Sequence, residues 1–416
     1  MIERSRLSTV PESWRVLRLK YVVQISKAKA DQRPDDLPYI GLEHIESWTG
    51  RILKEIENLD LALEGGISTV NLFTPEDILF GKLRPYLAKA CYPKYFGACT
   101  TEALVLKPLN ELIDPRYLLL SILLPEFIDE INADAFGSKM PRADWDTIGN
   151  IPIAVPPIHE QKAIADFLDR ETVRLDALIA AKENLSNLLV EKSRALITTA
   201  VSRGINPKVR LKESHIPWLG PVPEHWEIER AKWLFTERDI RSELGDEEML
   251  TVSHLTGVTT RAEKNVNMFM AENQEGSKIC EAGDLVINTL WAWMGAMGVS
   301  PQRGIVSPAY NVYEPGDRLD KTYLDYLVRM PVFAQEAIRY SKGVWSSRLR
   351  LYPEGLYEIW LPVPPVEEQR AISEFLKTET AKLDALRTAT ECTVALLRER
   401  RSALITAAVK GELATI

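Results

Sequence analysis

Two stretches of the chain carry apolar residues at the spacing of a long α-helix. Residues 159–200 and 367–409 contain no glycine or proline, and each follows a Pro-Pro pair, a position compatible with the start of a helix. The apolar positions are Ile164, Leu168, Leu175, Leu178, Leu185, Leu189 and Leu196, and then Ile372, Leu376, Leu383, Leu386, Leu397 and Leu404. Steps of three, four and seven predominate, which is typical of a coiled-coil seam. About forty residues at 1.5 Å each would form a rod of roughly 60 Å.

These stretches belong to a sequence that occurs twice in the chain. Val155–Ile164 reads VPPIHEQKAI and Val363–Ile372 reads VPPVEEQRAI, at an offset of 208 residues (369 − 161). A shorter element, Pro-Glu-x-Trp, begins at Pro11 and again at Pro223, at an offset of 212 (223 − 11). The chain therefore has two duplicated framework pieces, and self-similarity of this kind indicates an internal repeat.

The pieces between the repeats, roughly 21–150 and 233–358, resemble each other only faintly but share a pattern. Short β-type runs alternate with Gly/Pro turns, and a helical stretch stands near the end of each. The expected strands are Leu37–Leu42, Asp77–Phe80, Ala103–Leu106, Met249–Val252, Asp284–Asn288 and Ala309–Tyr313, and the expected helices are Pro115–Ala133 and Lys321–Tyr340. We therefore expect an α+β fold of two globular domains separated by two long coiled-coil helices, most simply antiparallel, with an internal pseudo-twofold repeat. An ordinary pair of core helices is the alternative.

The expected boundaries follow from this pattern. The first globular domain would occupy residues 1–150 and the first coiled-coil helix residues 151–206. A linker and the second globular domain would occupy 207–358, and the second helix 359–416.

Length, composition and charge allow this organisation without indicating a ligand. The 416 residues are 45% hydrophobic and 26% charged, with a formal net charge of −8. An acidic balance argues against nucleic acid, but net charge says nothing about its distribution. The four cysteines form no CxxC pair, and no run approaches the ~18 apolar residues of a membrane helix. We expect a cytoplasmic protein without a disulfide or zinc framework.

Basic and aromatic side chains gather in acid-free stretches of both diverged pieces. Residues 78–101, 285–313 and 337–353 contain no Asp or Glu. Lys and Arg neutralise phosphates, Arg can also bind guanine, and Asn can bind adenine. The candidate DNA-binding residues are Lys82, Arg84, Tyr86, Lys89, Lys139, Arg142, Asn288, Thr289, Trp291, Ser307, Tyr310, Lys342, Trp345, Arg348 and Arg350. For any single residue, the alternative is a solvated loop with its aromatic side chains in the core.

Motifs for catalysis are absent from the sequence. It has no GxxxxGK[ST] loop for ATP and no strand–GxGxxG–helix fingerprint. Val155 and Val363 precede the Pro-Pro pairs, where an amino-methyltransferase motif has Asn or Asp. No HExxH or GxSxG occurs, and the five histidines are scattered. We expect no active site on this chain.

The order of these elements resembles the specificity subunit of Type I restriction-modification enzymes. The resemblance runs along essentially the whole chain, and its most specific parts are the two Pro-Pro-x-x-Glu-Gln elements and the linker Ser214–Trp226. Asp77–Tyr86 (DILFGKLRPY) and Gly283–Trp293 (GDLVINTLWAW) are also similar to family members. The Trp-Leu-Gly portion of the linker motif is absent before Pro11.

This resemblance implies a non-catalytic subunit that reads a split, asymmetric site on double-stranded DNA. Each diverged piece would be a target recognition domain for one half of the site, and the helices would set the gap between the halves. Two methyltransferase (modification) subunits would dock on the duplicated framework, with candidate contacts at Pro157, Glu160, Gln161, Pro365, Glu368 and Gln369. Two restriction/translocase subunits could join them. S-adenosylmethionine, ATP and magnesium would belong to the partners, and this chain would bind no cofactor.

Two other readings remain open from sequence. A nuclease or methyltransferase acting alone would require a carboxylate cluster or a cofactor loop. A coiled-coil scaffold for protein interactions would require no DNA contact, and the basic-aromatic stretches argue against it.

Overall fold

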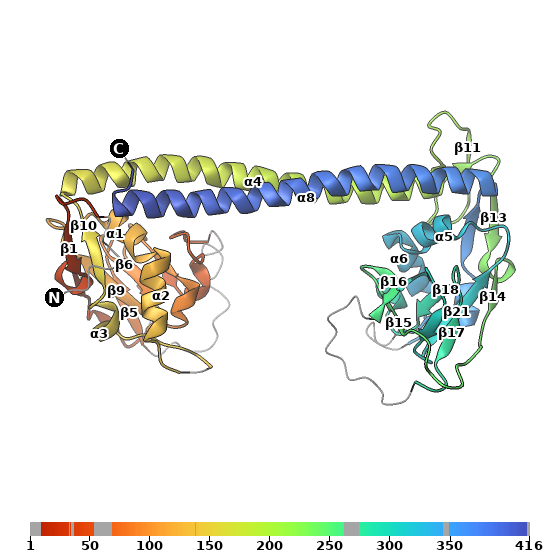
Figure 1. The fold of residues 1–416 in the computed structure, drawn as a ribbon, viewed down its shortest axis with the longest axis horizontal. Helices are drawn as coiled ribbons and strands as arrows, with labels where there is room; N and C mark the ends of the chain where they lie inside the picture. Colours follow the sequence, from red (N-terminus) through yellow and green to blue (C-terminus); the bar gives the residue numbers. More distant parts are fainter. Residues whose placement is uncertain are drawn as a thin grey trace. The chain divides into compact units, whose positions relative to one another are not determined.

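The computed structural model describes residues 10–32, 34, 37–53, 69–137, 139–261, 274–343 and 349–413. It divides into two compact units, residues 1–182 with 392–416, and residues 183–391. Each unit combines a sheet-rich domain with part of two long helices, α4 (Ile158–Arg203) and α8 (Val366–Lys410) (Figure 1).

The first unit is built on a four-stranded sheet of order β2-β9-β6-β7, beside a second sheet of order β3-β5-β8-β4 and the pair β1-β10. Its strands are β1 (Arg15–Arg18), β2 (Val23–Ile25), β3 (Lys29–Ala30), β4 (Tyr39–Ile40), β5 (Val70–Phe73), β6 (Ile78–Gly81), β7 (Ala90–Cys91), β8 (Gly97–Cys99), β9 (Ala103–Pro108) and β10 (Pro152–Val155). Its shorter helices are α1 (Pro115–Ile122), α2 (Pro125–Ala133) and α3 (Trp145–Ile148). All four residues of β6 are buried, so this strand forms the centre of the domain.

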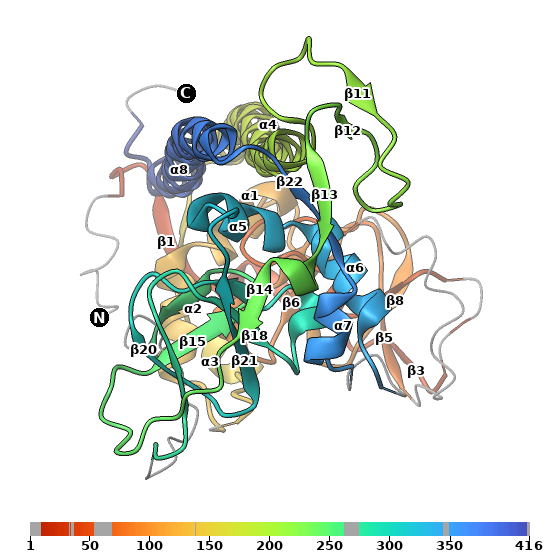
Figure 2. The same cartoon turned by 90° about the vertical axis from the view of Figure 1, so that its right-hand side faces the viewer.

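The second unit repeats the main sheet with the order β14-β21-β18-β19. Its strands are β11 (Leu211–Lys212), β12 (Val222–Pro223), β13 (Glu227–Arg230), β14 (Phe235–Glu237), β15 (Leu250–Ser253), β16 (Gly257–Thr260), β17 (Lys278–Cys280), β18 (Leu285–Asn288), β19 (Met297–Val299), β20 (Gly304–Val306), β21 (Tyr310–Pro315) and β22 (Trp360–Val363). Its shorter helices are α5 (Lys321–Val328), α6 (Pro331–Tyr340) and α7 (Pro353–Tyr357). Figure 2 faces this unit and shows β13 beside β22, an antiparallel pair that corresponds to β1 and β10.

The two main sheets also share their register. Ile78 of β6 stands opposite Leu106 of β9, and Leu285 of β18 stands opposite Tyr313 of β21. Both partners are shifted by the same 207 residues (285 − 78 and 313 − 106). The two units therefore share one arrangement of the main sheet, although their sequences are only faintly similar.

The late helices differ from the sequence expectation, because each is broken in two. Pro115–Ala133 was expected as one helix, but α1 ends at Ile122 and α2 starts at Pro125. Lys321–Tyr340 breaks in the same way before Pro331. Proline lacks an amide hydrogen and restricts the preceding residue to extended backbone, so it is accommodated at the first position of a new helix.

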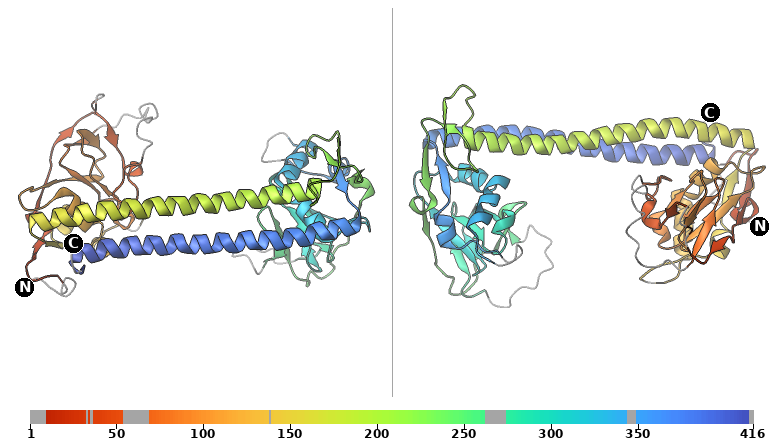
Figure 3. Two further views of the ribbon diagram at one scale, coloured as in Figure 1. Left: turned by 90° about the horizontal axis from the view of Figure 1, so that it is seen from above. Right: turned by 180° about the vertical axis from the view of Figure 1, so that it is seen from behind.

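The two long helices run antiparallel within each unit (Figure 3). In the first unit, Ile164 and Leu168 of α4 share a core with Ala408 and Val409 of α8, and Asp176 accepts a hydrogen bond from Arg401 at 2.9 Å. Residues later in α4 therefore contact residues earlier in α8, as expected for antiparallel helices. In the second unit, Ala200 and Val201 share a core with Ile372 and Leu376. The expected fold class, two α+β domains with long antiparallel helices, is confirmed.

Candidate DNA-contact surfaces

The two repeated framework elements meet in space, and this explains why they occur together. Trp14 of the first Pro-Glu-x-Trp element donates its indole N–H to the Glu160 carboxylate at 2.8 Å. Trp226 of the second donates to Glu368 at 3.1 Å. Both indoles are buried or nearly so, and a buried indole N–H requires an acceptor. The glutamate of Pro-Pro-x-x-Glu-Gln is therefore the acceptor for the tryptophan of the other element.

The ends of the long helices lie beside these tryptophans. α4 is followed by Gly204, with φ +75°, and α8 by Gly411, with φ +74°. Glycine adopts this left-handed conformation without strain. A side chain at Gly411 would also come within 3.0 Å of the Pro11 and Trp14 rings. Glycine at this position thus ends the helix and admits the aromatic ring.

The glutamines of the two Pro-Pro-x-x-Glu-Gln elements bind the long helices to their own domains. Gln161 is fully buried. Its side-chain oxygen accepts the Asp114 N–H at 2.8 Å, and its amide donates to the carbonyls of Leu112 and Pro156 at 3.0 and 2.8 Å. Asp114 in turn caps α1. The glutamine therefore joins the start of α4 to the start of α1.

Gln369 makes the same three bonds in the second unit, to Asp320 N–H and to the carbonyls of Arg318 and Pro364, each at 2.8 Å. It too is fully buried. The expectation that Gln161 and Gln369 contact a partner is therefore corrected, because neither has accessible surface. Among the other partner candidates, Pro365 is exposed, whereas Pro157, Glu160 and Glu368 are half-buried.

In the first unit, the candidate DNA-binding residues lie on two segments that are paired through their backbones. The turn after β6 contains η5 (Pro85–Leu87), a 3-10 turn. The segment 136–142 folds back on itself through two Phe136–Arg142 backbone bonds. Arg84 N–H donates to the Pro141 carbonyl at 2.7 Å, and Ala143 N–H donates to the Lys82 carbonyl at 3.0 Å. Segments about fifty residues apart thus form one surface.

The side chains on this surface differ in their freedom. Tyr86 is 47% exposed, Lys139 and Arg142 are exposed, and Lys82 and Arg84 are half-buried. Arg142 is ion-paired with Glu102 at 2.9 Å. Lys89 donates to the Leu42 carbonyl at 2.6 Å. The Lys89 ammonium is therefore engaged with the backbone at Leu42. This makes Lys89 a poor candidate for phosphate binding.

The second unit assembles the corresponding segments in the same way. The turn after β18 contains η8 (Ala292–Met294), and Lys342 and Arg350 form a two-residue backbone bridge. Leu351 N–H donates to the Thr289 carbonyl at 3.4 Å, the counterpart of the bond between Ala143 and Lys82. Lys342 and Arg350 are exposed. Trp345 and Arg348 lie outside the residues that the structure describes.

Several candidates in the second unit have their polar atoms engaged within the chain. Asn288 is 6% exposed, donates to the Tyr310 hydroxyl at 3.0 Å and accepts the Leu290 N–H. Burial raises the pKa of Tyr310, so its hydroxyl stays neutral. Thr289 donates to the Ala309 carbonyl at 2.7 Å, and Ser307 accepts the Ala309 N–H at 3.4 Å. Asn288, Thr289 and Ser307 therefore hold the turn in shape.

Trp293 lies in the acid-free stretch 285–313 but is not among the candidate DNA-binding residues selected from the sequence. Its ring stacks on Trp291, with 6.3 Å between ring centroids and 16° between planes. Trp291 is 51% exposed. The signal was present, because DILFGKLRPY and DLVINTLWAW align without a gap from Asp77 and Asp284, which sets Tyr86 against Trp293.

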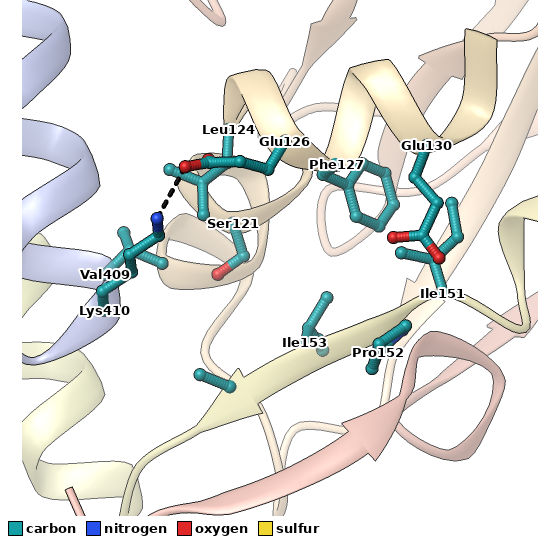
Figure 4. Close-up of a pocket in the computed structure, with 11 residues that line it drawn as sticks. Ser121, Leu124, Glu126, Phe127, Glu130, Ile151, Pro152, Ile153, Val409 and Lys410 are labelled. Carbon is teal, nitrogen blue, oxygen red and sulfur yellow. Dashed lines mark hydrogen bonds and ion pairs between the residues drawn. The ribbon is translucent and has the colours of Figure 1, made fainter. Parts of the chain in front are cut away.

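A small cavity lies away from these surfaces, among α2, β10 and the end of α8 in the first unit (Figure 4). Its volume is about 50 Å³, and its walls are mainly apolar. Lys410 donates to Glu126 at 2.6 Å at its rim. Burial is the largest single effect on the pKa of Glu126 and raises it, but the hydrogen bond from Lys410, a backbone hydrogen bond and the charge of Lys410 together lower the pKa below its usual value. The cavity has the volume of one or two water molecules.

Among the residues that the structure describes, no group of three or more His, Cys, Asp or Glu is placed to hold a metal ion. None of their helices combines the length and apolar character needed to cross a membrane.

Comparison with protein families gives a match that agrees with this architecture. Residues 11–187 match the Type I restriction modification DNA specificity domain. The chain is 24% identical over 401 residues to the MjaVIII specificity subunit of Methanocaldococcus jannaschii, an alignment that covers 89% of this chain and 86% of that one. The chain is similar to the specificity subunits of Type I restriction-modification enzymes over most of its length.

Further comparisons agree with this similarity. The chain is 26% identical over 210 residues to the Escherichia coli EcoDI specificity subunit, across 48% of this chain and 46% of that one. The crystal structure of the HsdS subunit from Thermoanaerobacter tengcongensis matches with a TM-score of 0.55 at 18% identity, over 97% and 98% of the two chains. A chain from a study of complex assembly and conformational transition of the type I R-M system matches with a TM-score of 0.66 at 18% identity, over 97% and 99%. The two structural matches support the fold described above.

Proposed function

We propose that this chain is the DNA-reading subunit of a Type I restriction-modification complex and recognises a split, asymmetric site. The observation that carries the proposal is the duplicated surface described above. Each unit places one turn and one paired backbone segment at the same edge of the same sheet. Basic and aromatic side chains on such a surface are the types that contact phosphates and base edges. Two different surfaces of one design suit two different half-sites.

Partner docking belongs to the framework. We propose that two methyltransferase subunits bind the chain through its duplicated elements, because equivalent surfaces admit equivalent partners. The exposed Pro365 and the half-buried Pro157, Glu160 and Glu368 border these elements. Two restriction/translocase subunits would complete a cleaving complex.

The chemistry would reside on those partners. We propose that this chain is not an enzyme and holds no cofactor, and that S-adenosylmethionine, ATP and magnesium bind to the partner subunits. Cellular DNA as the target places the complex in the cytoplasm. The coiled-coil scaffold without DNA recognition is not favoured, because the relatives are specificity subunits.

The test is single-molecule sequencing of DNA methylation in cells with the cognate methyltransferase, with and without this chain. We expect methyladenine on both strands of a motif with two short halves and a constant gap, and its loss when the chain is removed. Methylation that persists unchanged without the chain would contradict the proposal.

Purified components test the contact surface itself. Arg84→Ala and Arg348→Ala should each weaken duplex binding in the presence of the methyltransferase. Unchanged affinity in both variants would place the DNA elsewhere.

A further inference from the structure

The turns after β6 and β18 correspond residue by residue. Phe80 pairs with Ala90 between β6 and β7, and Ile287 pairs with Met297 between β18 and β19. Both members are shifted by 207 residues (287 − 80 and 297 − 90). The turns between these anchors therefore have equal length, which makes Arg84 the counterpart of Trp291 and Tyr86 the counterpart of Trp293.

The two turns also share backbone hydrogen bonds. Leu87 N–H donates to the Arg84 carbonyl at 2.9 Å, and Met294 N–H donates to the Trp291 carbonyl at 3.0 Å. Each turn ends on a residue with positive φ, Ala88 at 45° and Gly295 at 85°. The left-handed conformation is strained for alanine, and strain of this kind concentrates at functional sites. The 3-10 turn is thus kept in both units, but its first residue differs in backbone conformation: Arg84 has φ 51° and Trp291 has φ −125°. Arg84 N–H donates to the Pro141 carbonyl, whereas Trp291 N–H donates to the Asn288 carbonyl.

The chemistry that the turn presents also differs. The first unit presents a guanidinium and a phenol, Arg84 and Tyr86, and among the described residues no side-chain partner engages that guanidinium. The second presents two stacked indoles. Trp293 donates its N–H to the Leu290 carbonyl at 3.1 Å, which orients its ring and supports the exposed Trp291 ring against it.

We propose that the first position of this turn reads one base in each half-site, with a different chemistry in each unit. This inference rests on the proposed function. Arg84 would read a guanine in one half, because a guanidinium donates two hydrogen bonds to guanine O6 and N7 in the major groove. The Trp291–Trp293 pair would read a thymine in the other half, because its apolar faces contact the thymine methyl group and offer no acceptor or fork of donors. One G·C pair and one A·T pair therefore occupy equivalent places in the two halves.

The neighbouring residues act as positioning residues. The Asn288 amide is bonded to Tyr310 and Leu290, and Thr289 is bonded to Ala309. They hold the second turn without facing DNA with free polar atoms. This leaves the indole pair as the part of the turn that is available to a base.

The experiment compares methylation motifs of the full chain and its variants, each expressed with the cognate methyltransferase. Arg84→Ala should make one G·C position degenerate in one half of the motif, with discrimination falling about tenfold or more, and leave the other half unchanged. Trp291→Ala should make one A·T position degenerate in the other half. Trp233→Ala is the matched control, because Trp233 is a 69% exposed indole of the same unit outside the turn. That variant should keep both halves.

A second measurement isolates the methyl group. Once the A·T position is known, replacing its thymine with deoxyuridine should lower methylation by the wild-type complex in vitro and have no further effect with Trp291→Ala. Trp291→Phe should retain the thymine preference, since phenylalanine also contacts the methyl group.

The outcomes separate this inference from the proposed function. A split motif for the wild type that neither variant changes would overturn the inference and leave the function standing. So would degeneracy of both variants in the same half, or a deoxyuridine duplex methylated as well as thymine. A variant with native circular dichroism that methylates no sequence would also count against it, because loss of one base contact predicts degeneracy. Absence of any split motif with the wild-type chain would overturn the function itself.

Discussion

At the scale of single residues, the repeated sequence elements are explained by long-range hydrogen bonds. The indole of Trp14 needs the Glu160 carboxylate, and the buried amide of Gln161 needs three backbone partners. Pro156 is five residues from Gln161, and every other partner is at least 47 residues from the side chain that it satisfies. A glutamine is suited to this position because it offers one acceptor and two donors without charge.

Replacing Gln161 should therefore reduce the free energy of unfolding by more than the loss of its side-chain volume alone would. Gln161→Ala leaves the Asp114 N–H and the carbonyls of Leu112 and Pro156 without partners inside the protein. We expect about 3 kcal/mol of destabilisation. Hydrogen exchange of the Asp114 amide measures it, and this amide should exchange at least tenfold faster.

The control for this substitution is its exposed neighbour. Lys162→Ala should leave exchange at Asp114 unchanged, because Lys162 is exposed on the same turn of α4. Equal protection of Asp114 in the Gln161→Ala variant would show that the glutamine does not secure α1.

At the scale of elements, the leucines along the long helix α4 differ in how deeply they are buried. In the first unit, Leu168 of α4 is fully buried in the core that also contains residues of α1 and α8. Further along the same helix, the seam residues Leu175 and Leu189 are 8% and 7% exposed, whereas Leu178 is 44% exposed. Leu188, which lies outside the predicted seam, is 51% exposed. Burial along α4 is therefore unequal from one leucine to the next.

This unequal burial predicts unequal costs for the same substitution. Leu168→Ala should destabilise the first unit by about 2–5 kcal/mol, because it removes buried methyl groups and leaves a cavity. Leu188→Ala should change stability by less than about 1 kcal/mol. Thermal unfolding of the two variants, followed by circular dichroism, compares them directly, and equal melting temperatures would contradict the burial pattern.

At the scale of the whole molecule, two units share one sheet order, one turn and one framework, while α4 and α8 contribute to both. The two units therefore carry candidate DNA-contact surfaces of the same backbone design and different side-chain chemistry. A duplicated frame permits each surface to diverge independently. We predict that the length of the helices sets the gap between the half-sites, because both helices contribute to both units.

Lengthening both helices should therefore lengthen the gap. Seven residues inserted after Lys182 of α4 and seven after Glu391 of α8 preserve the heptad spacing of the seam. They add about 10 Å of helix, equivalent to up to about three base pairs at ~3.4 Å each. Methylation sequencing should then show the same two half-sites with a longer gap. An unchanged gap would show that the helices do not set it.

The sequence by itself determined the features that arise from local pattern and from internal comparison. Helical spacing and the absence of glycine and proline predicted α4 and α8, since a helix is defined by contacts within a few residues. The 208-residue repeat predicted the duplicated architecture. Proline positions also determined the breaks before Pro125 and Pro331, although we had expected uninterrupted helices there.

Only the tertiary structure decided which residues face outward for a ligand. Asn288 and Arg84 are both DNA-binding types, yet burial engages the first in holding a turn and leaves the second without a side-chain partner among the described residues. Gln161 was expected from the sequence to contact a partner, but its side chain is buried and makes hydrogen bonds inside the protein. Such roles depend on partners that include Tyr310, 22 residues from Asn288, and Asp114 and Leu112, 47 and 49 residues from Gln161. Chain separation carries no information about which distant groups will meet. The packing of the folded chain decides which side chains are buried and hydrogen-bonded, and therefore which ones remain on the candidate DNA-contact surfaces.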